Sequence, residues 1–395
     1  MPVASPPALE AFLTQELALL ERKHWQRACR VLEPTTGPLV QYDGRTYLHF
    51  ASNDYLSLAR DARVIRAAAE ALAHYGLGSG ASRLMSGTSP LHEQLETRLA
   101  QFKQQEAALL FSSGYLTNLG LITSLVGPGD VVVCDHANHA SLIDACRLSR
   151  ARLRVYPHGD VARLQQLLER HATAHRRLIV SDGVFSMDGD VAPLRELVDV
   201  ARAAEAWLLV DDAHGSFVLG AHGRGSLELC GVEEDVTVQM GTLSKALGGL
   251  GGFVVGARVL IQWLLHRARP FIYSTALPPA VVAGALAALT IVEEEPERRQ
   301  RVLVLAARLR EGLRAQGWDT LQSTTHIVPV LIGETATALD VAQALLAGGI
   351  YAPAVRPPTV PEGTARLRLS VTALHTDAHV DQCLTVLHDL RARMR

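Results

Sequence analysis

Short apolar runs recur through the middle of the chain, and each one ends in polar residues or glycine. The runs are VVVCD (131–135), RLIVSDG (177–183), WLLVDDAHG (207–215), VTVQMGT (236–242) and GFVVG (252–256). Runs of this length that are rich in β-branched residues predict strands buried on both faces of a sheet. Between most of them lie helical patterns, such as PLHEQLETRLAQFKQ, whose leucines fall on one face. Alternating strands and helices predict an α/β fold with a mostly parallel, doubly wound sheet.

The alternation of strands and helices changes character near residue 290. A chain of 395 residues is too long for one ordinary core, and we expect three parts. Residues 1–50 are predicted to form an N-terminal arm with an amphipathic helix and a hairpin around Asp43-Gly44. Residues 51–290 are predicted to form a large α/β domain, and residues 291–395 a smaller C-terminal α+β domain.

The charges of the chain are nearly balanced, with 38 basic and 40 acidic residues and a net charge of −2. No general field therefore attracts nucleic acid or an anionic membrane. One stretch of 22 residues, 271–292, has no charge, but Pro278 and Pro279 divide it. The apolar segment that remains is too short to span a bilayer. We therefore expect a buried helix there, and no partnership with nucleic acid or membrane.

The five cysteines, an odd number, lie far apart and form no C-x-x-C pair: Cys29, Cys134, Cys146, Cys230 and Cys383. This pattern argues against both a disulfide framework and a zinc knuckle. The N-terminus has no basic segment ahead of an apolar one, so we expect neither a signal nor a transit peptide. Both observations favour a cytoplasmic location.

Polar residues gather at the ends of the predicted strands. They are Asp135 and His139, Ser181 to Ser186, Asp211 and His214, and Thr242 to Lys245. Doubly wound sheets bind ligands beyond the carboxyl ends of their strands. We therefore expect these side chains to line one shared pocket.

Lys245 lies in GTLSKALGGLGG (241–252), just behind a strand and among small residues. Burial in such a setting lowers the pKa of a lysine, and an amine of that kind forms Schiff bases. Asp211 has two interpretations. It is either a helix cap or a carboxylate that keeps a pyridine nitrogen protonated in the same pocket as that lysine.

His136 and His139 are spaced as H-x-x-H beside Asp135, a pattern that a metal-dependent hydrolase could use. No third and fourth ligands with suitable spacing are evident, so one imidazole stacked on a flat ring explains the motif better. The glycines after Lys245 lack the spacing of a dinucleotide fingerprint. In contrast, FSSGYLTNLG (111–120) predicts a helix N-terminus suited to a phosphate.

Arg356, Arg366 and Arg368 lie in apolar surroundings late in the chain. In a strand, residues 366 and 368 share one face. A guanidinium binds a carboxylate through two parallel hydrogen bonds, so one of these arginines could hold a substrate carboxylate. An exposed basic stripe accounts for the spacing equally well.

Seven motifs, in order along nearly the whole chain, resemble the α-oxoamine synthase family of pyridoxal phosphate enzymes. They are ASNDYLSLA, GSGASRLMSGTSPLHEQLE, DHANHASLIDA, GVFSMDGDVAPL, VDDAHGSFVLGAHGRGS, GTLSKALGG and RPPTVPEGTARLRLSVTALHT. The resemblance implies the type I aminotransferase fold and a homodimer with active sites at its interface. It also implies an acyltransferase that joins an amino acid to an acyl thioester with loss of CO2.

Within this family, the motifs are most similar to members that use L-alanine and a pimeloyl thioester, on the route to biotin. The thioester could be carried by CoA or by a carrier protein. Glycine-using members that take acetyl-CoA, and members that form 5-aminolevulinate, are the alternatives within the family. Tyr115, where phenylalanine is common, and Ser57, where glycine is expected, depart from the pattern without removing a reacting group.

The resemblance implies roles for the residues at matching positions. Lys245 carries pyridoxal phosphate as a Schiff base, Asp211 pairs with the ring nitrogen, and His214 hydrogen-bonds the ring oxygen. The residues placed around the cofactor are His139, stacked on the ring, Gly114 and Tyr115 at its border, and the hydroxyls of Ser186 and Thr242. Thr275 is implied to reach the phosphate across the dimer interface.

Four residues are implied to bind the substrates. Arg368 holds the carboxylate of the amino acid, while Arg27 and Thr359 contact the acyl substrate, and His139 faces both cofactor and substrate.

Overall fold

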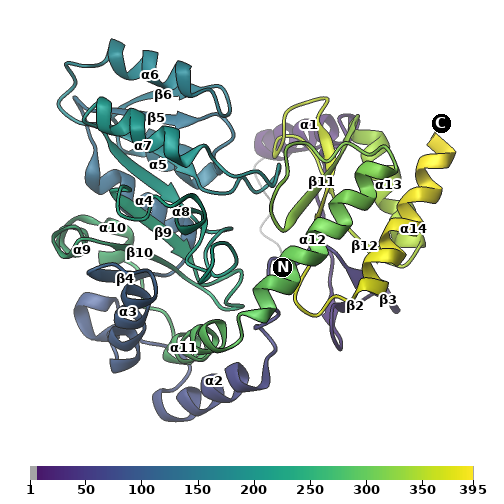
Figure 1. Ribbon diagram of the computed structural model, residues 1–395, viewed down its shortest axis with the longest axis horizontal. Coiled ribbons are helices and arrows are strands. Elements are labelled where there is room, and N and C mark those ends of the chain that lie inside the picture. The colour runs from purple at the N-terminus through teal and green to yellow at the C-terminus, as the bar shows by residue number, and fades with distance from the viewer. Residues whose placement is uncertain (1–6, 395) are drawn as a thin grey trace.

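The computed structural model describes residues 7–394 and consists of two lobes (Figure 1). Residues 1–6 of the predicted arm and residue 395 of the predicted C-terminal domain lie outside the described residues. The larger lobe, on the left in Figure 1, surrounds the central sheet. The smaller lobe, on the right, contains the C-terminal part of the chain, and α12 (Glu297–Ala315) runs from one lobe into the other.

The central sheet has seven strands in the order β4-β10-β9-β8-β7-β5-β6. Their bounds are β4 (Ala107–Phe111), β5 (Val131–Asp135), β6 (Arg152–Tyr156), β7 (Arg177–Asp182), β8 (Trp207–Asp211), β9 (Val238–Thr242) and β10 (Gly252–Gly256). The strands from β6 to β9 are parallel, whereas β10 is antiparallel to both β9 and β4. The mostly parallel sheet and the five predicted strands are confirmed.

Two strands of this sheet, β4 and β6, were not predicted. β6 has the sequence RLRVY and lies at the edge of the sheet, with its arginines only partly covered. An edge strand needs no continuous apolar run, so it lacks the pattern that marks the central strands. β4 contains two alanines, which are weak strand formers, and its burial depends on its neighbour β10.

Both faces of the central sheet are covered, as the alternation of buried residues along β5 shows. Val132 and Cys134 belong to the cluster that packs against helices α4 (Gly114–Leu125), α5 (Ala140–Leu148) and α9 (Arg258–Arg267). Val131 and Val133 belong to the opposite cluster, with helices α6 (Val161–Arg170) and α7 (Leu194–Ala203). Period-two alternation thus buries both faces and leaves the strand ends as the open edge.

The other helices of the larger lobe pack against this sheet or against one another. They are α2 (Ala62–Tyr75), α3 (Pro90–Phe102), α8 (Ser226–Cys230), α10 (Arg269–Ile272), α11 (Pro279–Glu294) and the π-helix η1 (Arg83–Gly87). The uncharged run forms α11, which begins after Pro278 and is largely buried, as expected. Within residues 7–394, no helix is both long enough and apolar enough to cross a membrane.

The smaller lobe contains two antiparallel-rich sheets and the helices α12, α13 (Thr335–Ala347) and α14 (Asp377–Met394). One sheet has the order β11-β14-β13, with β11 (Ile327–Gly333), β13 (Ala354–Val355) and β14 (Ala365–Ser370). The other has the order β1-β2-β3-β12, with β1 (Glu33–Pro34), β2 (Leu39–Tyr42), β3 (Arg45–His49) and β12 (Ile350–Tyr351).

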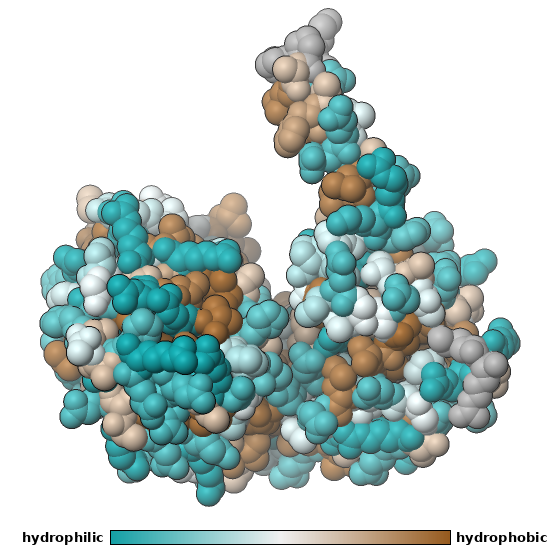
Figure 2. Space-filling view, turned by 90° about the horizontal axis from the view of Figure 1, so that it is seen from above, coloured by the Kyte–Doolittle hydropathy of each residue, from teal (hydrophilic) through white to brown (hydrophobic). Residues whose placement is uncertain are grey.

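The predicted hairpin turns at Asp43 and Gly44, whose φ angles of +50° and +71° suit a tight turn between β2 and β3. Because β3 pairs with β12, the N-terminal hairpin belongs structurally to the smaller lobe. Helix α1 (Pro7–Arg22) precedes it and extends away from both lobes (Figure 2). Its apolar residues are uncovered, and Phe12 is 57% exposed.

Candidate active site

The predicted polar residues meet where the parallel strands end. Asp182 ends β7, Asp211 ends β8 and Thr242 ends β9. Lys245 lies in the short connection 243–251 between β9 and the antiparallel β10. Both ends of this connection are held in the sheet, because Thr242 pairs with Gly252, and the amide of Leu243 donates to the carbonyl of Gly251 at 3.0 Å.

Lys245 is partly exposed to solvent, but protein atoms surround its amine, and this desolvation lowers the pKa of the amine from 10.5 to about 8. The carboxylates of Asp211 and Asp182 oppose this shift, whereas the positive charge of Arg368 adds to it. An amine with this pKa is roughly half neutral at pH 8, the form that attacks an aldehyde.

The carboxylate of Asp211 is buried and held at both oxygens. Oδ1 accepts the backbone N–H of Ala213 at 2.9 Å, and Oδ2 accepts Nδ2 of Asn118 at 2.7 Å. Two directed donors fix the plane of the carboxylate. Asp211 thus combines the cap-like contact with Ala213 and a position near Lys245, so the two interpretations from sequence are compatible.

His214 is buried beside Tyr55, whose hydroxyl lies 2.7 Å from Nδ1. Burial, followed by the positive charge of Lys245, lowers the pKa of His214 well below its ordinary value. The imidazole is therefore neutral at physiological pH. Tyr55, which the sequence motifs contained without a role, orients it.

Arg368 on β14 reaches the same place from the smaller lobe. Its guanidinium donates to the hydroxyl of Tyr55 at 3.0 Å, to Oδ1 of Asn53 at 3.1 Å and to the carbonyl of Ser186. Arg366 forms an ion pair with Asp188 instead, at 2.5 Å. Both arginines are buried, so the exposed basic stripe is wrong, and only Arg368 contacts the residues around His214.

The predicted phosphate site is a helix N-terminus, as expected. Helix α4 begins at Gly114, and its N-cap Ser113 accepts the backbone N–H of Leu116 at 3.2 Å. Gly252 allows close approach, because a Cβ there would lie 2.9 Å from the backbone nitrogen of Gly114. The hydroxyl of Thr242 lies 2.6 Å from that of Ser244.

Two predicted cofactor neighbours lie nearby. Ser112 donates to the backbone carbonyl of Thr275 at 3.1 Å, so the backbone of Thr275 lies beside the start of α4 in its own chain. That its side chain reaches a phosphate across a dimer interface stays a prediction. The ring of Tyr115 is 44% exposed, and its hydroxyl donates to Asp144 at 2.6 Å.

His139 is the N-cap of α5, and its backbone N–H donates to Asp182 at 2.7 Å. Burial lowers the pKa of His139, and the charges of Asp211 and Lys245 also act on it. The structure therefore brings His139 close to both predicted site residues. Its stacking on a cofactor ring stays a prediction.

Arg27 and Thr359, which the resemblance pairs, are 332 positions apart and in direct contact. Nη2 of Arg27 donates to the hydroxyl of Thr359 at 3.1 Å. They line a groove of about 720 Å³ between the N-terminal arm and the smaller lobe, together with Arg30 and Arg356. Arg356 also donates to the carbonyl of Gln26. Three guanidinium groups here suit an anionic group on a ligand.

The metal hydrolase hypothesis gains no support from the described part of the chain. No group of three or more His, Cys, Asp or Glu side chains within it is arranged to hold a metal ion. The carboxylate of Asp135 is engaged by the backbone N–H groups of Ala137 and Gly159 and by Nδ1 of His158. It is therefore committed to local structure.

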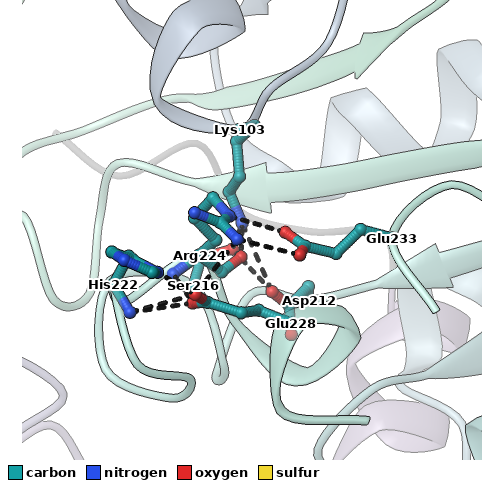
Figure 3. Close-up of polar contacts among 7 residues, drawn as sticks. All are labelled: Lys103, Asp212, Ser216, His222, Arg224, Glu228 and Glu233. Carbon is teal, nitrogen blue, oxygen red and sulfur yellow. Dashed lines mark hydrogen bonds and ion pairs between the residues drawn. The ribbon is translucent and has the colours of Figure 1, made fainter. Parts of the chain in front are cut away.

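Next to Asp211 in the sequence, Asp212 forms a buried ion pair with Lys103 (Figure 3), which anchors the segment that carries Asp211 and His214. Nζ of Lys103 lies 3.4 Å from Oδ2 of Asp212 and donates to the hydroxyl of Ser216 at 2.8 Å. Asp212 also accepts the backbone N–H of Ser226 at 3.0 Å. A Cβ at Gly225 would lie 1.7 Å from this carboxylate, so only glycine fits there.

Several of these supporting residues were missed from the sequence. Asn53, Tyr55, Lys103, Asn118 and Asp212 act through hydrogen bonds to residues far away in the chain. Asn53 and Tyr55 lie in ASNDYLSLA and Asn118 in FSSGYLTNLG, so the motifs were the only available signal.

Comparison with known proteins agrees with this geometry. The family model for class I and II aminotransferases matches residues 45–387. An 8-amino-7-oxononanoate synthase from Geobacter sulfurreducens is 49% identical over 374 residues, which cover 94% of this chain and 96% of that protein.

Two solved structures extend the comparison. A serine palmitoyltransferase from S. paucimobilis, with a PLP–myriocin aldimine bound, has a TM-score of 0.93 at 34% identity, covering 99% of each chain. An 8-amino-7-oxononanoate synthase from Francisella tularensis has a TM-score of 0.77 at 27% identity, covering 88% of this chain and 98% of that one. This protein belongs to the class I and II aminotransferase family.

Proposed function

We propose that this enzyme condenses L-alanine with a pimeloyl thioester, with loss of CO2, to form 8-amino-7-oxononanoate on the route to biotin. The observation that carries the proposal is the buried amine of Lys245 beside Asp211, in a chain 49% identical to an 8-amino-7-oxononanoate synthase over nearly its full length. The metal hydrolase has no comparable support.

The residues present fit pyridoxal phosphate as the cofactor. The site combines an amine whose pKa is lowered to about 8, a buried carboxylate and a helix N-terminus. When bound, the cofactor supplies an electron sink for negative charge at the α-carbon of an amino acid.

The resemblance and the contacts around Lys245 support the following cofactor-binding residues. Lys245 would bind the aldehyde, Asp211 the ring nitrogen, and the neutral His214 the ring oxygen. The start of α4, with Gly114, and the hydroxyl of Thr242 would bind the phosphate. Tyr115, His139 and Ser186 would complete the walls, with His139 against the ring face.

Nζ of Lys245 is the proposed base that removes the α-proton of the amino acid. A neutral amine with a pKa of about 8 accepts a proton from the α-carbon and returns it at a later step. Arg368 would bind the carboxylate of alanine. Its guanidinium is already held beside His214 by hydrogen bonds to Tyr55 and Asn53. A carboxylate held there is oriented for proton removal.

The acyl substrate would enter through the groove of Arg27 and Thr359. A pimeloyl thioester carries a free carboxylate at the far end of its chain, and its CoA or carrier-protein arm carries phosphate. Both are anions that Arg27 can bind with the support of Arg30 and Arg356.

We infer further that the enzyme is a cytoplasmic homodimer. The free cysteines fit a reducing compartment. Large apolar side chains are exposed on the larger lobe, including Leu77, Met85 and Tyr273. Exposed apolar surface of this kind supports a contact with a second subunit. Thr275 then reaches the phosphate of the neighbouring site.

Product identification tests the proposal. The purified enzyme with pyridoxal phosphate is incubated with alanine or glycine and with pimeloyl-CoA, pimeloyl carrier protein or acetyl-CoA. We expect mass spectrometry to detect 8-amino-7-oxononanoate only with alanine and a pimeloyl donor. Preferential turnover of glycine with acetyl-CoA would instead assign the protein to the glycine-using members, and no turnover of any thioester would refute the function.

A further inference from the structure

The side chain of Asn118 links two groups of the active site that do not touch each other. Its Nδ2 lies 2.7 Å from Oδ2 of Asp211 and 2.9 Å from the hydroxyl oxygen of Ser141. The hydroxyl of Ser141 in turn lies 2.8 Å from Nδ1 of His139. Asn118 and Ser141 are both 1% exposed, so water does not compete for these contacts.

The direction of each hydrogen bond follows from Asp211. An ionised carboxylate only accepts, so Nδ2 of Asn118 faces it and donates. The second hydrogen of Nδ2 then points at Ser141, whose oxygen must accept it. The opposite orientation of the amide would place Oδ1 of Asn118 against the carboxylate of Asp211, which is repulsive. The proton of the Ser141 hydroxyl is thereby left free for His139.

His139 must therefore hold a lone pair at Nδ1. The backbone N–H of Ser141, which can only donate, also points at Nδ1, at 3.3 Å. Two donors on one ring nitrogen exclude a proton there, so the proton of the neutral imidazole lies on Nε2. The pKa of His139 is lowered, mainly by burial, which favours the neutral ring. The positive charge of Lys245 adds to this shift, whereas the carboxylates of Asp211 and Asp144 oppose it.

We propose that Asn118 and Ser141 are positioning residues that hold His139 as the neutral Nε2–H tautomer and couple it to Asp211. The consequence for the reaction rests on the proposed function. His139 then offers the substrate a hydrogen-bond donor and no free lone pair, so it binds an oxygen of the substrate and cannot remove the α-proton. Lys245 remains the base.

Nitrogen NMR of the full-length enzyme with bound pyridoxal phosphate reads the tautomer directly. The protein is labelled with ¹⁵N-histidine, and the resonances of His139 are identified among the 16 histidines by their loss in His139→Gln. We expect Nε2 to appear as an N–H nitrogen and Nδ1 as a lone-pair nitrogen that accepts a hydrogen bond. A proton on Nδ1 of His139 would overturn the proposal.

Two variants test the coupling. Ser141→Ala removes the hydroxyl donor to Nδ1 and leaves only the longer backbone N–H contact at 3.3 Å. Asn118→Leu removes the donor to Ser141 without itself contacting His139. We expect both to shift the Nδ1 resonance toward that of an unbonded lone pair. Ser124→Ala is the matched control, because Ser124 is a buried hydroxyl on the same helix as Asn118 and donates only to the carbonyl of Gly120.

An unchanged Nδ1 resonance in folded Asn118→Leu would show that Asn118 does not act on His139 and would refute the coupling. If this variant fails to fold, Asn118→Ala provides the same test with a smaller side chain. The measurement needs no substrate. A failed product assay therefore refutes the proposed reaction alone, whereas a protonated Nδ1 refutes this inference alone.

Discussion

Replacing Lys245 with methionine should make the cofactor-free protein more stable. Folding moves a charged amine out of water, and this is why the pKa of Lys245 falls from 10.5 to about 8. Each unit of difference between folded and unfolded pKa corresponds to about 1.4 kcal/mol. Keeping the charged amine in the pocket therefore lowers the free energy of unfolding by about 3 kcal/mol. Methionine has a similar length and carries no charge.

The sign of the pH dependence follows from the same difference. Below pH 8 the amine is protonated in both the folded and the unfolded chain, and the full penalty applies. Between about pH 8 and pH 10.5 the unfolded chain binds more protons than the folded one, so the wild-type protein gains stability as the pH rises. The advantage of Lys245→Met should thus be about 3 kcal/mol at pH 7 and should shrink toward pH 10.5.

Urea unfolding of the cofactor-free proteins at a series of pH values measures this effect. Lys23→Met is the matched control. Lys23 is exposed, and its ammonium lies 4.5 Å from the centre of the Trp25 ring, so its replacement should change stability by no more than about 1 kcal/mol. Equal stabilities of wild type and Lys245→Met at pH 7, or a difference that does not change with pH, would refute the burial argument.

Three further variants probe other parts of the site. Lys103→Met should lower the free energy of unfolding by about 3–5 kcal/mol in urea titrations, since it leaves the buried carboxylate of Asp212 without its cation; a loss as small as that of Lys23→Met would contradict this. Asp211→Asn should still bind the cofactor, but exchange of the α-proton of alanine in deuterated water should fall by about 100-fold; unchanged exchange would exclude its role. Arg368→Lys should raise the KM for alanine by roughly 10- to 100-fold in steady-state kinetics, and an unaltered KM would move the carboxylate site elsewhere.

The strands of the central sheet could be predicted only in part. Central strands such as β7 and β8 are continuous apolar runs because both faces are buried, so their sequence reveals them. The antiparallel direction of β10 follows from the length of the connection before it. The connection 243–251 is too short for the crossover that a parallel strand requires, so β10 had to run antiparallel.

Some residues of the site could be predicted from local motifs, whereas others could not. Lys245, Asp211 and His214 lie in local motifs directly after strands, where chemistry and position coincide. The contact of Asn118 with Asp211 spans 93 positions, and that of Lys103 with Asp212 spans 109. No spacing rule relates residues so far apart, because their meeting depends on how the helices pack against the sheet. Arg368 and Arg366 likewise differ only in what their guanidinium groups contact.

The connection that bears Lys245 is fastened at both ends and also folds back on itself, since the amide of Gly248 donates to the carbonyl of Lys245 at 2.8 Å. These hydrogen bonds hold the backbone of residues 243–251 in place, so the amine of Lys245 moves only through its side chain. Rotations about the side-chain bonds can therefore move the amine without any change in this backbone. The pace of turnover should then be limited by chemistry or by product departure, with no wait for this segment to rearrange.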